Sequence, residues 1–385
     1  MNKKSNVINN TFSDIIPELR AVAIDSLSRM YRPKEKLFAF RLRKDGEGEI
    51  LEGVSRRYTA TVLIGLACED EQVTTKVLGN HSPEDICNNL INDIDTMNDL
   101  GQAALTCWAA RAIKHPLVHK VVEALGKFYS AKNAFTIVEL SWALTALSFE
   151  SDIVTNNALI KKFAEILMDS FNPKSAIFSH GSVRKISDKS IKKYLSLLFR
   201  HVSCFADFVY PIQALSYYYK LTRDSRAAEI VFHCSEQMCK LQGDEGQWWW
   251  HFDNRTGRVL ERFPVYSVHQ DSMAPMALFA VEKTFGTSFT PAIEKGLNWL
   301  NNSPEISGSL IDTKRNIIWR KVTRREPRKL VRSLQAASSR IYSGFRAPAV
   351  DFVFPACEID YESRPYHAGW ILHAWPQNQK FGFSV

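Results

Sequence analysis

The sequence predicts an all-α fold, a single α/α toroid or barrel of antiparallel helix hairpins. Apolar residues recur at spacings of three and four along most of the chain, most clearly over 135–149. No Gly-, Pro- or Ser-rich linker divides the chain, so we expect one domain over 19–375 between a flexible N-terminal segment (1–18) and a C-terminal tail (376–385). No repeat of fixed period occurs, which favours a closed toroid over an α-solenoid.

The expected helices follow one another through short polar connections. Turn and cap residues such as His115-Pro116 and Thr290-Pro291 separate them. The segment near 310–319 differs, because two short apolar runs around a polar turn predict a β-hairpin there. We place helices over 58–67, 98–113, 116–129, 135–149, 157–171, 208–221, 227–241, 273–285 and 291–300.

Basic residues are unevenly distributed along the chain. The formal charge of the 385 residues is +8, from 49 basic and 41 acidic side chains, but 320–332 alone carries seven basic residues against Glu326. This stretch contains Pro327 and no aromatic residue to stack on bases, which disfavours nucleic acid as a partner. Two interpretations stay open: a solvated surface loop, or a docking surface for acidic lipid headgroups or an anionic polymer. The seven basic residues are Arg320, Lys321, Arg324, Arg325, Arg328, Lys329 and Arg332.

The cysteines and the N-terminus predict a cytoplasmic protein without a metal or cofactor. The seven cysteines are scattered and form no Cys-x-x-Cys pair, and no phosphate-loop or dinucleotide-binding motif occurs. Segment 1–12 is polar and lacks an apolar signal core, and no run of about 18 apolar residues is present. Peripheral contact with a membrane through 320–332 is the alternative location.

The densest group of candidate functional residues lies in segment 244–276. Trp248, Trp249 and Trp250 are consecutive, and three adjacent indoles cannot all face a core, so at least one should line a cavity or a surface. Carboxylates and histidines surround them, which is unusual in a core because each buried polar group needs a partner. A structural turn held by tryptophan packing is the alternative. The polar residues are Asp244, Glu245, His251, Asp253, Arg255, Glu261, His269, Gln270 and Asp271.

Two parts of the sequence resemble the QW motif of terpenoid cyclases. Gln242, Gly246 and Trp248 match its second half, and Lys295-Gly296 with Trp299-Leu300 matches its first half, although neither copy is complete. In that family the glutamine and tryptophan of the motif tie the ends of helices together. The resemblance therefore implies an α/α toroid.

A second candidate segment runs over 92–108. Residues 93–96 (Asp-Ile-Asp-Thr) resemble the DxDD acid motif of class II terpene cyclases, with a threonine in place of the third acid. Adjacent carboxylates can raise one another's pKa and leave a proton available for donation. The other interpretation is local, because Asn98 or Asp99 suits the N-terminus of the following helix.

A third candidate segment runs over 358–370. Arg364-Pro365-Tyr366 should place a guanidinium at the start of the last helix, where it can hold a carboxylate or a phosphate. A salt-bridged closure between the first and last hairpins of the ring is the alternative. Residues 55–59 (Ser-Arg-Arg-Tyr-Thr) repeat this arrangement early in the chain, and a toroid would bring the two helix starts together at one mouth.

These segments favour a carbohydrate-active enzyme of the six-hairpin toroid type, either a glycoside hydrolase or a sugar epimerase, with a saccharide as its partner. Glycosidases need two carboxylates beside the scissile bond, and epimerases of similar fold use histidines as acid and base. We expect His269 as the base, Asp271 or Glu362 as the acid or its orienting group, and Trp249 as a stacking wall. A terpenoid-cyclase-like or prenyl-binding toroid and a non-catalytic toroid that binds a glycan or partner protein are the alternatives.

The candidates fall into two sets. The catalytic set consists of His269, Asp271, Glu362, Glu245 and Asp253. The substrate-binding set consists of Trp248, Trp249, Trp250, His251, Tyr266, Gln270, Arg364, Tyr366, His367, Asp95 and Asp99.

Overall fold

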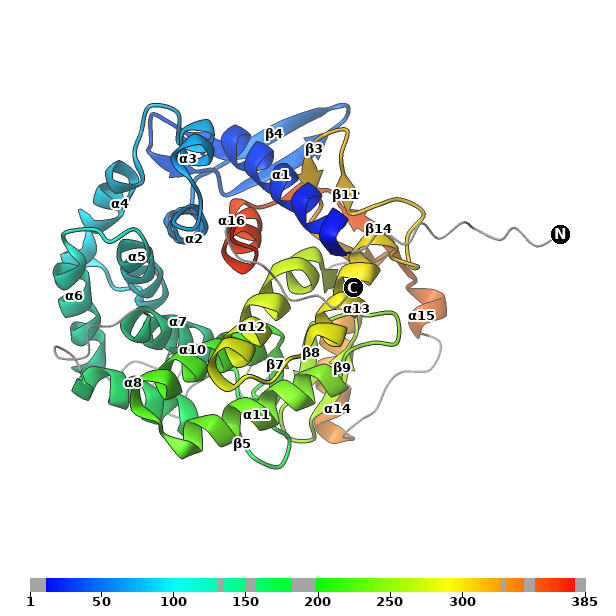
Figure 1. The fold of residues 1–385 in the computed structure, drawn as a ribbon. Helices are drawn as coiled ribbons and strands as arrows, with labels where there is room; N and C mark the ends of the chain where they lie inside the picture. The colour runs from blue at the N-terminus through cyan, green and yellow to red at the C-terminus, as the bar shows by residue number, and fades with distance from the viewer. Residues whose placement is uncertain are drawn as a thin grey trace.

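Helices form a closed ring with an inner and an outer layer (Figure 1). The computed structural model describes residues 12–130, 135–149, 157–181, 199–326, 330–342 and 350–377. Each inner helix packs against the next one along the chain, and the last packs against the first, which closes the ring. The inner helices are α2 (Arg56–Leu66), α5 (Leu100–Ala112), α7 (Ile137–Ser148), α10 (Ala206–Thr222), α12 (Ala274–Phe285) and α16 (Pro365–Ala374).

Outer helices cover this ring and pair with inner ones as antiparallel hairpins, which confirms the predicted toroid. The first outer helix begins at Phe12, inside the segment 1–18 that was expected to be flexible. Residues 1–11, and 378–385 of the predicted tail, lie outside the described residues. The outer helices are α1 (Phe12–Met30), α3 (Glu71–Leu78), α4 (Pro83–Ile91), α6 (Val118–Ser130), α8 (Asn157–Asp169), α11 (Ser225–Lys240) and α13 (Thr290–Asn301).

Short antiparallel sheets connect the helices. The three-stranded sheets are β3 (Arg41–Asp45) and β4 (Gly48–Glu52) with β15 (Glu362–Ser363), β7 (Val202–Cys204) with β8 (His251–Asp253) and β9 (Arg258–Glu261), and β10 (Val265–Tyr266) with β13 (Lys321–Arg324) and β14 (Ala356–Asp360). The two-stranded ones are β1 (Tyr31–Arg32) with β2 (Leu37–Phe38), β5 (Phe171–Asn172) with β6 (Ile177–Phe178), and β11 (Ile311–Asp312) with β12 (Ile317–Ile318). The last pair is the hairpin predicted near 310–319.

Four of these strands lead directly into inner helices. β4 precedes α2, β7 precedes α10, and β15 precedes α16. β10 precedes the π-helix η2 (His269–Met273), which continues into α12. Three further elements complete the described fold: the 3-10 turn η1 (Ile94–Thr96) and the helices α14 (Leu330–Ile341) and α15 (Val350–Val353). The sheets therefore surround the end of the ring at which the inner helices begin.

Aromatic side chains fill the centre of the ring. The rings of Trp108 on α5 and Trp370 on α16 lie 5.3 Å apart, and the Trp370 indole N–H donates to the Tyr210 hydroxyl of α10 at 3.1 Å. These three helices are not all neighbours in the ring, so the contacts cross its interior. Such side chains bury 150–250 Å² each, typical of a core. The interior of the ring is therefore filled by packed side chains.

Two glycines allow α2 and α16 to approach closely where the ring closes. A Cβ atom on Gly65 would lie 2.3 Å from the carbonyl oxygen of Gly369, and one on Gly369 would lie 2.9 Å from the backbone of Thr61. Both distances are far below van der Waals contact, so a side chain at either position would push the helices apart.

The partial QW motif ties helix ends together, as its resemblance implied. The Gln242 side-chain amide follows α11 and donates to the Ala292 carbonyl in α13 at 2.9 Å. It also donates to the Gly246 carbonyl at 3.0 Å. Trp248 packs against Gly296 of α13, where a Cβ atom would lie 2.8 Å from the indole nitrogen. Two neighbouring outer helices are thus joined through these side chains.

The basic stretch is in part a strand rather than a solvated loop. Residues 321–324 form β13 between two other strands, and each of the four basic residues from Arg320 to Arg325 pairs with an acid. The expectation of a solvated loop is wrong there because sheet pairing places acids beside these cations. Residues 327–329 lie outside the described part of the chain. The pairs are Arg320–Glu362, Lys321–Asp360, Arg324–Glu261 and Arg325–Glu358.

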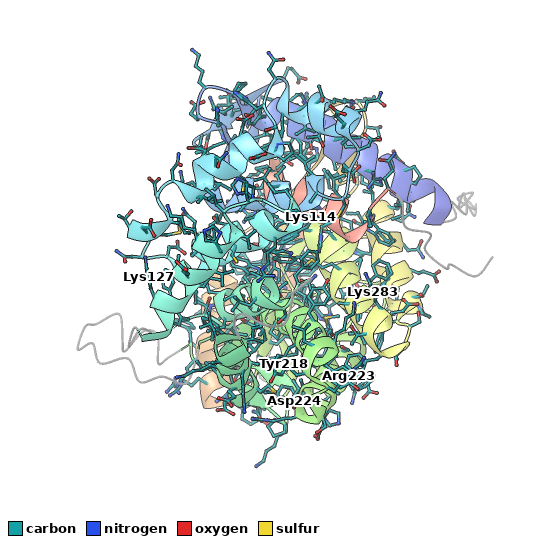
Figure 2. All side chains as sticks on the ribbon, turned by 60° about the vertical axis from the view of Figure 1, so that its left-hand side comes forward. Lys114, Lys127, Tyr218, Arg223, Asp224 and Lys283 are labelled. Carbon is teal, nitrogen blue, oxygen red and sulfur yellow. The ribbon has the colours of Figure 1, made fainter. Side chains whose placement is uncertain are left out.

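The opposite end of the ring, where inner helices end, carries basic side chains (Figure 2). Lys114 follows α5, Arg223 is the C-cap of α10, and Lys283 lies in the last turn of α12. Cations at these positions complement the partial negative charge of helix C-termini. No helix in the described residues combines the length and the apolar character needed to cross a membrane.

Candidate active site at the mouth of the ring

The inner helices begin at one end of the ring, which we call the mouth. Arg364 donates to the Tyr58 hydroxyl at 2.6 Å, and the rings of Tyr58 and Tyr366 lie 4.8 Å apart. These contacts join the starts of α2 and α16, so the prediction that the two Arg-Tyr segments meet is confirmed. Farther round the ring, the His180 carbonyl accepts from the backbone N–H of Ile137, the first residue of α7, at 3.1 Å.

Two carboxylates from neighbouring inner helices share one guanidinium nitrogen at the mouth. Nη2 of Arg57, at the start of α2, donates to Oδ1 of Asp99 at 2.5 Å and to Oε1 of Glu139 at 3.0 Å. Asp99 is the N-cap of α5 and accepts from the Gln102 N–H, and Glu139 completes a capping box with Thr136 at the start of α7. The helix starts therefore fix the positions of both carboxylates.

This group is open to solvent. The side chains of Arg57, Asp99 and Glu139 are 35%, 42% and 20% exposed. Burial opposes the charge on Arg57, but the hydrogen bonds and the charges of the two acids outweigh it and raise the pKa of Arg57 above its ordinary value. A Cβ atom on Gly101 would lie 2.9 Å from the Arg57 guanidinium, so glycine makes room for it on α5. The half-buried Trp142 ring lies 6.0 Å from the guanidinium carbon.

Glu362 organises a second charged group at the mouth, the arginine cluster of Arg41, Arg320 and Arg364. Its carboxylate accepts from Arg364 at 2.5 Å and lies 2.9 Å from nitrogens of Arg41 and of Arg320. Burial raises the pKa of Glu362, but the three guanidinium groups outweigh burial and hold it below the ordinary value. Glu362 therefore stays ionised, which suits an anchor for the arginines better than a proton donor. The same contacts link β3 and β15 in the salt-bridged closure considered as the alternative.

Aromatic rings cover the sides of the mouth. The Arg364 guanidinium lies 4.5 Å from the Phe40 ring, and the Arg320 guanidinium lies 5.3 Å from the Tyr266 ring. Tyr266 stacks on Trp250 at 4.4 Å. Phe40 is exposed and Trp250 is half-buried, so their faces can stack on the apolar faces of sugars, whereas Tyr266 is buried.

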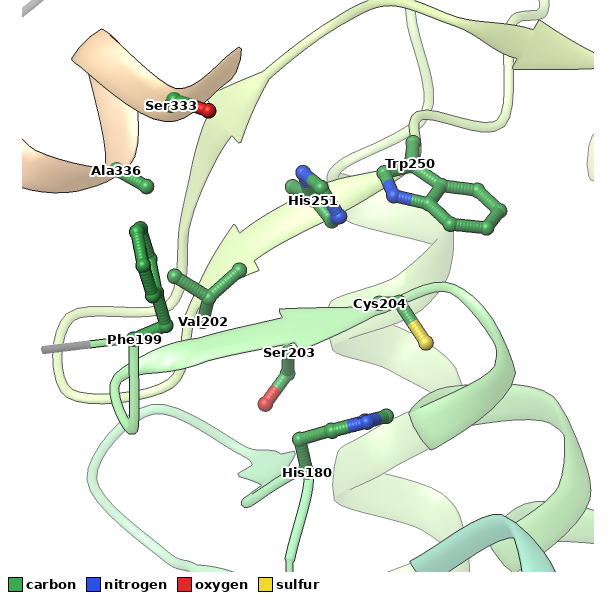
Figure 3. Close-up of a pocket in the computed structure, with 9 residues that line it drawn as sticks. All are labelled: His180, Phe199, Val202, Ser203, Cys204, Trp250, His251, Ser333 and Ala336. Carbon is green, nitrogen blue, oxygen red and sulfur yellow. The ribbon is translucent and has the colours of Figure 1, made fainter. Parts of the chain in front are cut away.

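One of the three consecutive tryptophans lines a cavity, as the sequence predicts. Trp250 is half-buried and borders a cavity of about 440 Å³ together with His251, His180 and Cys204 (Figure 3). Trp248 and Trp249 are buried instead. The Trp249 ring packs edge-on against Phe263, so Trp250, rather than the expected Trp249, is the indole that borders the cavity.

The structure brings His269, Asp271 and His367 close together but buries all three. The His269 ring stacks on Trp250 at 5.8 Å, and its burial lowers its pKa to about 3. Both oxygens of Asp271 lie within 2.9 Å of Nε2 of His367. Gln270 is also buried and bonds to the backbone of Trp248. A buried carboxylate held in this way joins η2 to α16 and offers no surface to a substrate.

Three further candidate acids lie away from the carboxylates at the mouth. Asp253 is buried and pairs with Arg255 at 2.7 Å. Asp95 is exposed on η1 and pairs with Lys120 at 3.0 Å on the outer helix α6. Glu245 is exposed in the turn after α11. Among the described residues, none of these three acids forms a hydrogen bond or ion pair with Arg57, so the structure does not unite them with the carboxylates at the mouth.

The sequence analysis missed Glu139 as a functional candidate. Its spacing from Thr136 is that of a capping box, a signal that marks a helix start and is visible in the sequence. Nothing in the sequence places Glu139 beside Asp99 and Arg57, because 82 residues separate it from Arg57. Only the closed ring brings the three helix starts together.

The closed double ring defines a class of fold, the six-hairpin α/α toroid. The chain is similar to an unsaturated glucuronyl hydrolase specific for heparin (12% identity, TM-score 0.59, covering 94% of this chain and 95% of that one). It is also similar to the unsaturated glucuronyl hydrolase of Bacillus sp. GL1 (9%, TM-score 0.58, 94% and 96%) and a glycosyl hydrolase family 88 protein of Bacteroides vulgatus (10%, 0.56, 94% and 97%).

These similarities establish the fold alone. The sequence identities of 12% and 9% are too low to assign the activity of those proteins to this chain. No family model matches the sequence, and no curated protein matches it in sequence. The chemistry of this chain therefore has to be argued from its own side chains.

Proposed function

We propose that the protein is a glycoside hydrolase that acts on a saccharide bound at the mouth of the ring. The observation that carries this proposal is the pair of exposed carboxylates, Asp99 and Glu139, held by Arg57 above Trp142. Glycoside hydrolysis uses two carboxylates beside the scissile bond and benefits from an aromatic platform for the sugar. Similar structures named as glucuronyl and glycosyl hydrolases agree with this function.

The spacing of the two carboxylates favours a retaining reaction. Their oxygens lie 2.5 and 3.0 Å from one nitrogen, which keeps them within the about 5–5.5 Å typical of a retaining pair. In such a reaction Asp99, the more exposed acid, attacks the anomeric carbon while Glu139 protonates the leaving oxygen. Glu139 then takes a proton from the water that releases the sugar from Asp99. Arg57 positions both groups and has to release Glu139 as the substrate enters, because a carboxyl group paired with a guanidinium stays ionised and has no proton to donate.

The arginine cluster favours an acidic saccharide. Arg41, Arg320 and Arg364 share the carboxylate of Glu362. Arg41 and Arg43 also pair with Glu52, and Arg320 and Lys321 pair with Asp360, so five cations face three acids there. Guanidinium groups bind sugar carboxylates and sulfates in bidentate fashion. One similar structure is named as specific for heparin and another for glycosaminoglycan degradation, and both are acidic polymers. An isoprenoid ligand would instead need a mouth with few charges.

The proposal is tested by incubating the purified protein with acidic and neutral oligosaccharides. The panel contains unsaturated heparin and chondroitin disaccharides on one side and cello- and xylo-oligosaccharides on the other. Mass spectrometry and a reducing-sugar assay detect cleavage. We expect turnover of the acidic members. Turnover of neutral members alone would overturn the assignment of the arginine cluster, and no turnover of either set would overturn the hydrolase.

Amide substitutions test the catalytic pair without disturbing the helix caps. Asp99→Asn and Glu139→Gln remove the ionisable group but retain cap acceptors, so each should lower kcat by about 10²–10⁴-fold with the helical circular dichroism unchanged. Asp70→Asn and Asp85→Asn are matched controls, because these acids cap the outer helices α3 and α4. Full activity in both mouth variants, or an equal loss in the controls, would contradict the assignment.

A further inference from the structure

A histidine, a cysteine and an aspartate converge beside the cavity. One ligand atom of each of His180, Cys204 and Asp207 lies within 4.8 Å of the others. Nδ1 of His180 is 3.0 Å from Oδ2 of Asp207. An imidazole nitrogen, a thiolate and a carboxylate oxygen are all ligands that zinc accepts.

Backbone contacts hold the three residues in place. His180 follows β6, Cys204 ends β7, and Asp207 lies in the first turn of α10. The Cys204 N–H donates to Oδ2 of Asp207 at 2.8 Å, and Cys204 pairs with His251 in the sheet of β7 and β8. The His180 carbonyl is bonded to the start of α7, as described for the mouth. The group is therefore built on rigid elements, as a metal site requires.

The three side chains differ in burial. The difference suits a metal site in which three coordination positions are filled by the protein and one faces solvent. Asp207 is fully buried, Cys204 is half-buried, and the His180 side chain is 52% exposed. His180 and Cys204 both line the cavity of about 440 Å³, and Figure 3 shows the His180 ring next to the Cys204 sulfur. An ion between the three residues would face this cavity on its remaining side.

We propose that His180, Cys204 and Asp207 bind a divalent transition-metal ion of the zinc class, with a fourth coordination position open to the cavity. Bond lengths of about 2.0–2.3 Å place the ligand atoms of a tetrahedral zinc site about 3.5 Å apart, so the separations of up to 4.8 Å need only contract. Binding breaks the hydrogen bond between His180 and Asp207, and the proton of that bond leaves to solvent together with the thiol proton of Cys204.

This site is separate from the carboxylate pair proposed for hydrolysis. Its ligands lie just after β6, at the end of β7 and in the first turn of α10, whereas Asp99 and Glu139 lie at the starts of α5 and α7. The sequence predicts no metal because His180 and Cys204 lie 24 positions apart, outside the spacings of known short zinc motifs. A protein that binds no metal could still be a hydrolase, and a protein without hydrolase activity could still bind the metal. The two proposals are therefore tested independently.

The test is a titration of the purified full-length protein with Co²⁺ and Zn²⁺ after treatment with a chelator. Co²⁺ should produce a thiolate-to-metal absorption band at one equivalent, and Zn²⁺ should abolish the band by competition. Cys204→Ser should remove the band and weaken Zn²⁺ binding by 100-fold or more. Cys357→Ser is the matched control, because Cys357 is the exposed thiol on β14, and it should bind like the unmodified protein.

Asp207→Asn and His180→Asn complete the test. Each should weaken Zn²⁺ binding by at least tenfold, and native mass spectrometry should show one bound ion in the unmodified protein. His180 is half-exposed, so its variant stays informative even if Cys204→Ser unfolds. The proposal is overturned if the band survives in Cys204→Ser, if Cys357→Ser removes it, or if no equimolar complex forms at micromolar metal.

Discussion

Two histidine–aspartate pairs make the same contact in different surroundings. His180 lies 3.0 Å from Asp207, and His367 lies 2.8 Å from Asp271. Both carboxylates are fully buried, but the His180 side chain is 52% exposed and the His367 side chain only 6%. One pair faces a cavity at the mouth, and the other lies inside the ring between η2 and α16.

The difference in exposure suggests different roles for the two pairs. The His180–Asp207 pair can be reached by a ligand, whereas the His367–Asp271 pair can only stabilise the fold. The charge of Asp207 raises the pKa of His180 to about 11, yet His180 remains accessible from the cavity. The buried pair is built into the core, because the Asp271 backbone carbonyl also accepts from the Trp375 indole at 2.5 Å. Both aspartates are buried to the same degree, so the exposure of the histidine is what distinguishes the two pairs.

The largest expected effect comes from breaking the buried pair. His367→Ala leaves Asp271 as a buried charge without its partner, which should lower the free energy of unfolding by about 3–5 kcal/mol. Urea denaturation followed by circular dichroism measures the change. A loss below 1 kcal/mol would contradict the structural role of the pair.

Two histidines with lowered pKa values extend the comparison to the pH dependence of stability. Among the described residues, burial lowers the pKa of His269 to about 3 and that of His373 to about 4. The unfolded chain takes up these protons near pH 6.5, so stability should fall as the pH drops from 6.5 towards 4, by up to about 1.4 kcal/mol per pH unit for each histidine.

Substitution of one such histidine isolates its share of the pH dependence. His373→Phe should reduce the slope of the unfolding free energy against pH by up to about 1.4 kcal/mol per pH unit between pH 6 and pH 4.5, because one proton fewer is taken up on unfolding. Urea denaturation at several pH values measures the slope. His233→Gln is the control, because His233 is exposed on α11 and its removal should leave the slope unchanged. Equal slopes in all three proteins would refute the assignment.

The helix contact beside the buried pair should be sensitive to a single methyl group. Gly65→Ala places a Cβ atom against the Gly369 carbonyl, so α2 and α16 have to separate at a cost of about 1–3 kcal/mol. Gly126→Ala on α6 is the matched control, since a Cβ atom there meets nothing within 4 Å. Thermal unfolding of the two variants makes the comparison, and equal stability would argue against the tight closure of the ring.

The smallest expected effect comes from the open pair. His180→Ala should change the free energy of unfolding by less than about 1 kcal/mol in the presence of a chelator. Water from the cavity can replace the half-exposed imidazole beside Asp207, which also keeps its hydrogen bond from the Cys204 N–H. The same denaturation assay as for His367→Ala applies. Equal losses in the two alanine variants would erase the distinction between the pairs.

The helical architecture can be predicted from the sequence alone. The spacing of apolar residues placed the inner helices, and α5 and α7 begin within two residues of the predicted positions. The alternation of helix and short turn was enough to predict a ring, and the partial QW motif identified a real link between α11 and α13. Local periodicity and capping act over a few residues, so they can be read from one segment at a time.

The grouping of polar side chains into sites depends on tertiary packing and cannot be predicted from the sequence. Trp248 and Trp250 are two residues apart, yet one is core and the other lines a cavity. Arg57 meets Glu139 across 82 positions, and Glu362 meets Arg41 across 321. Sequence patterns identify helix starts but not which of them face each other. That depends on how the closed ring packs, since every inner helix is held by neighbours distant in the chain.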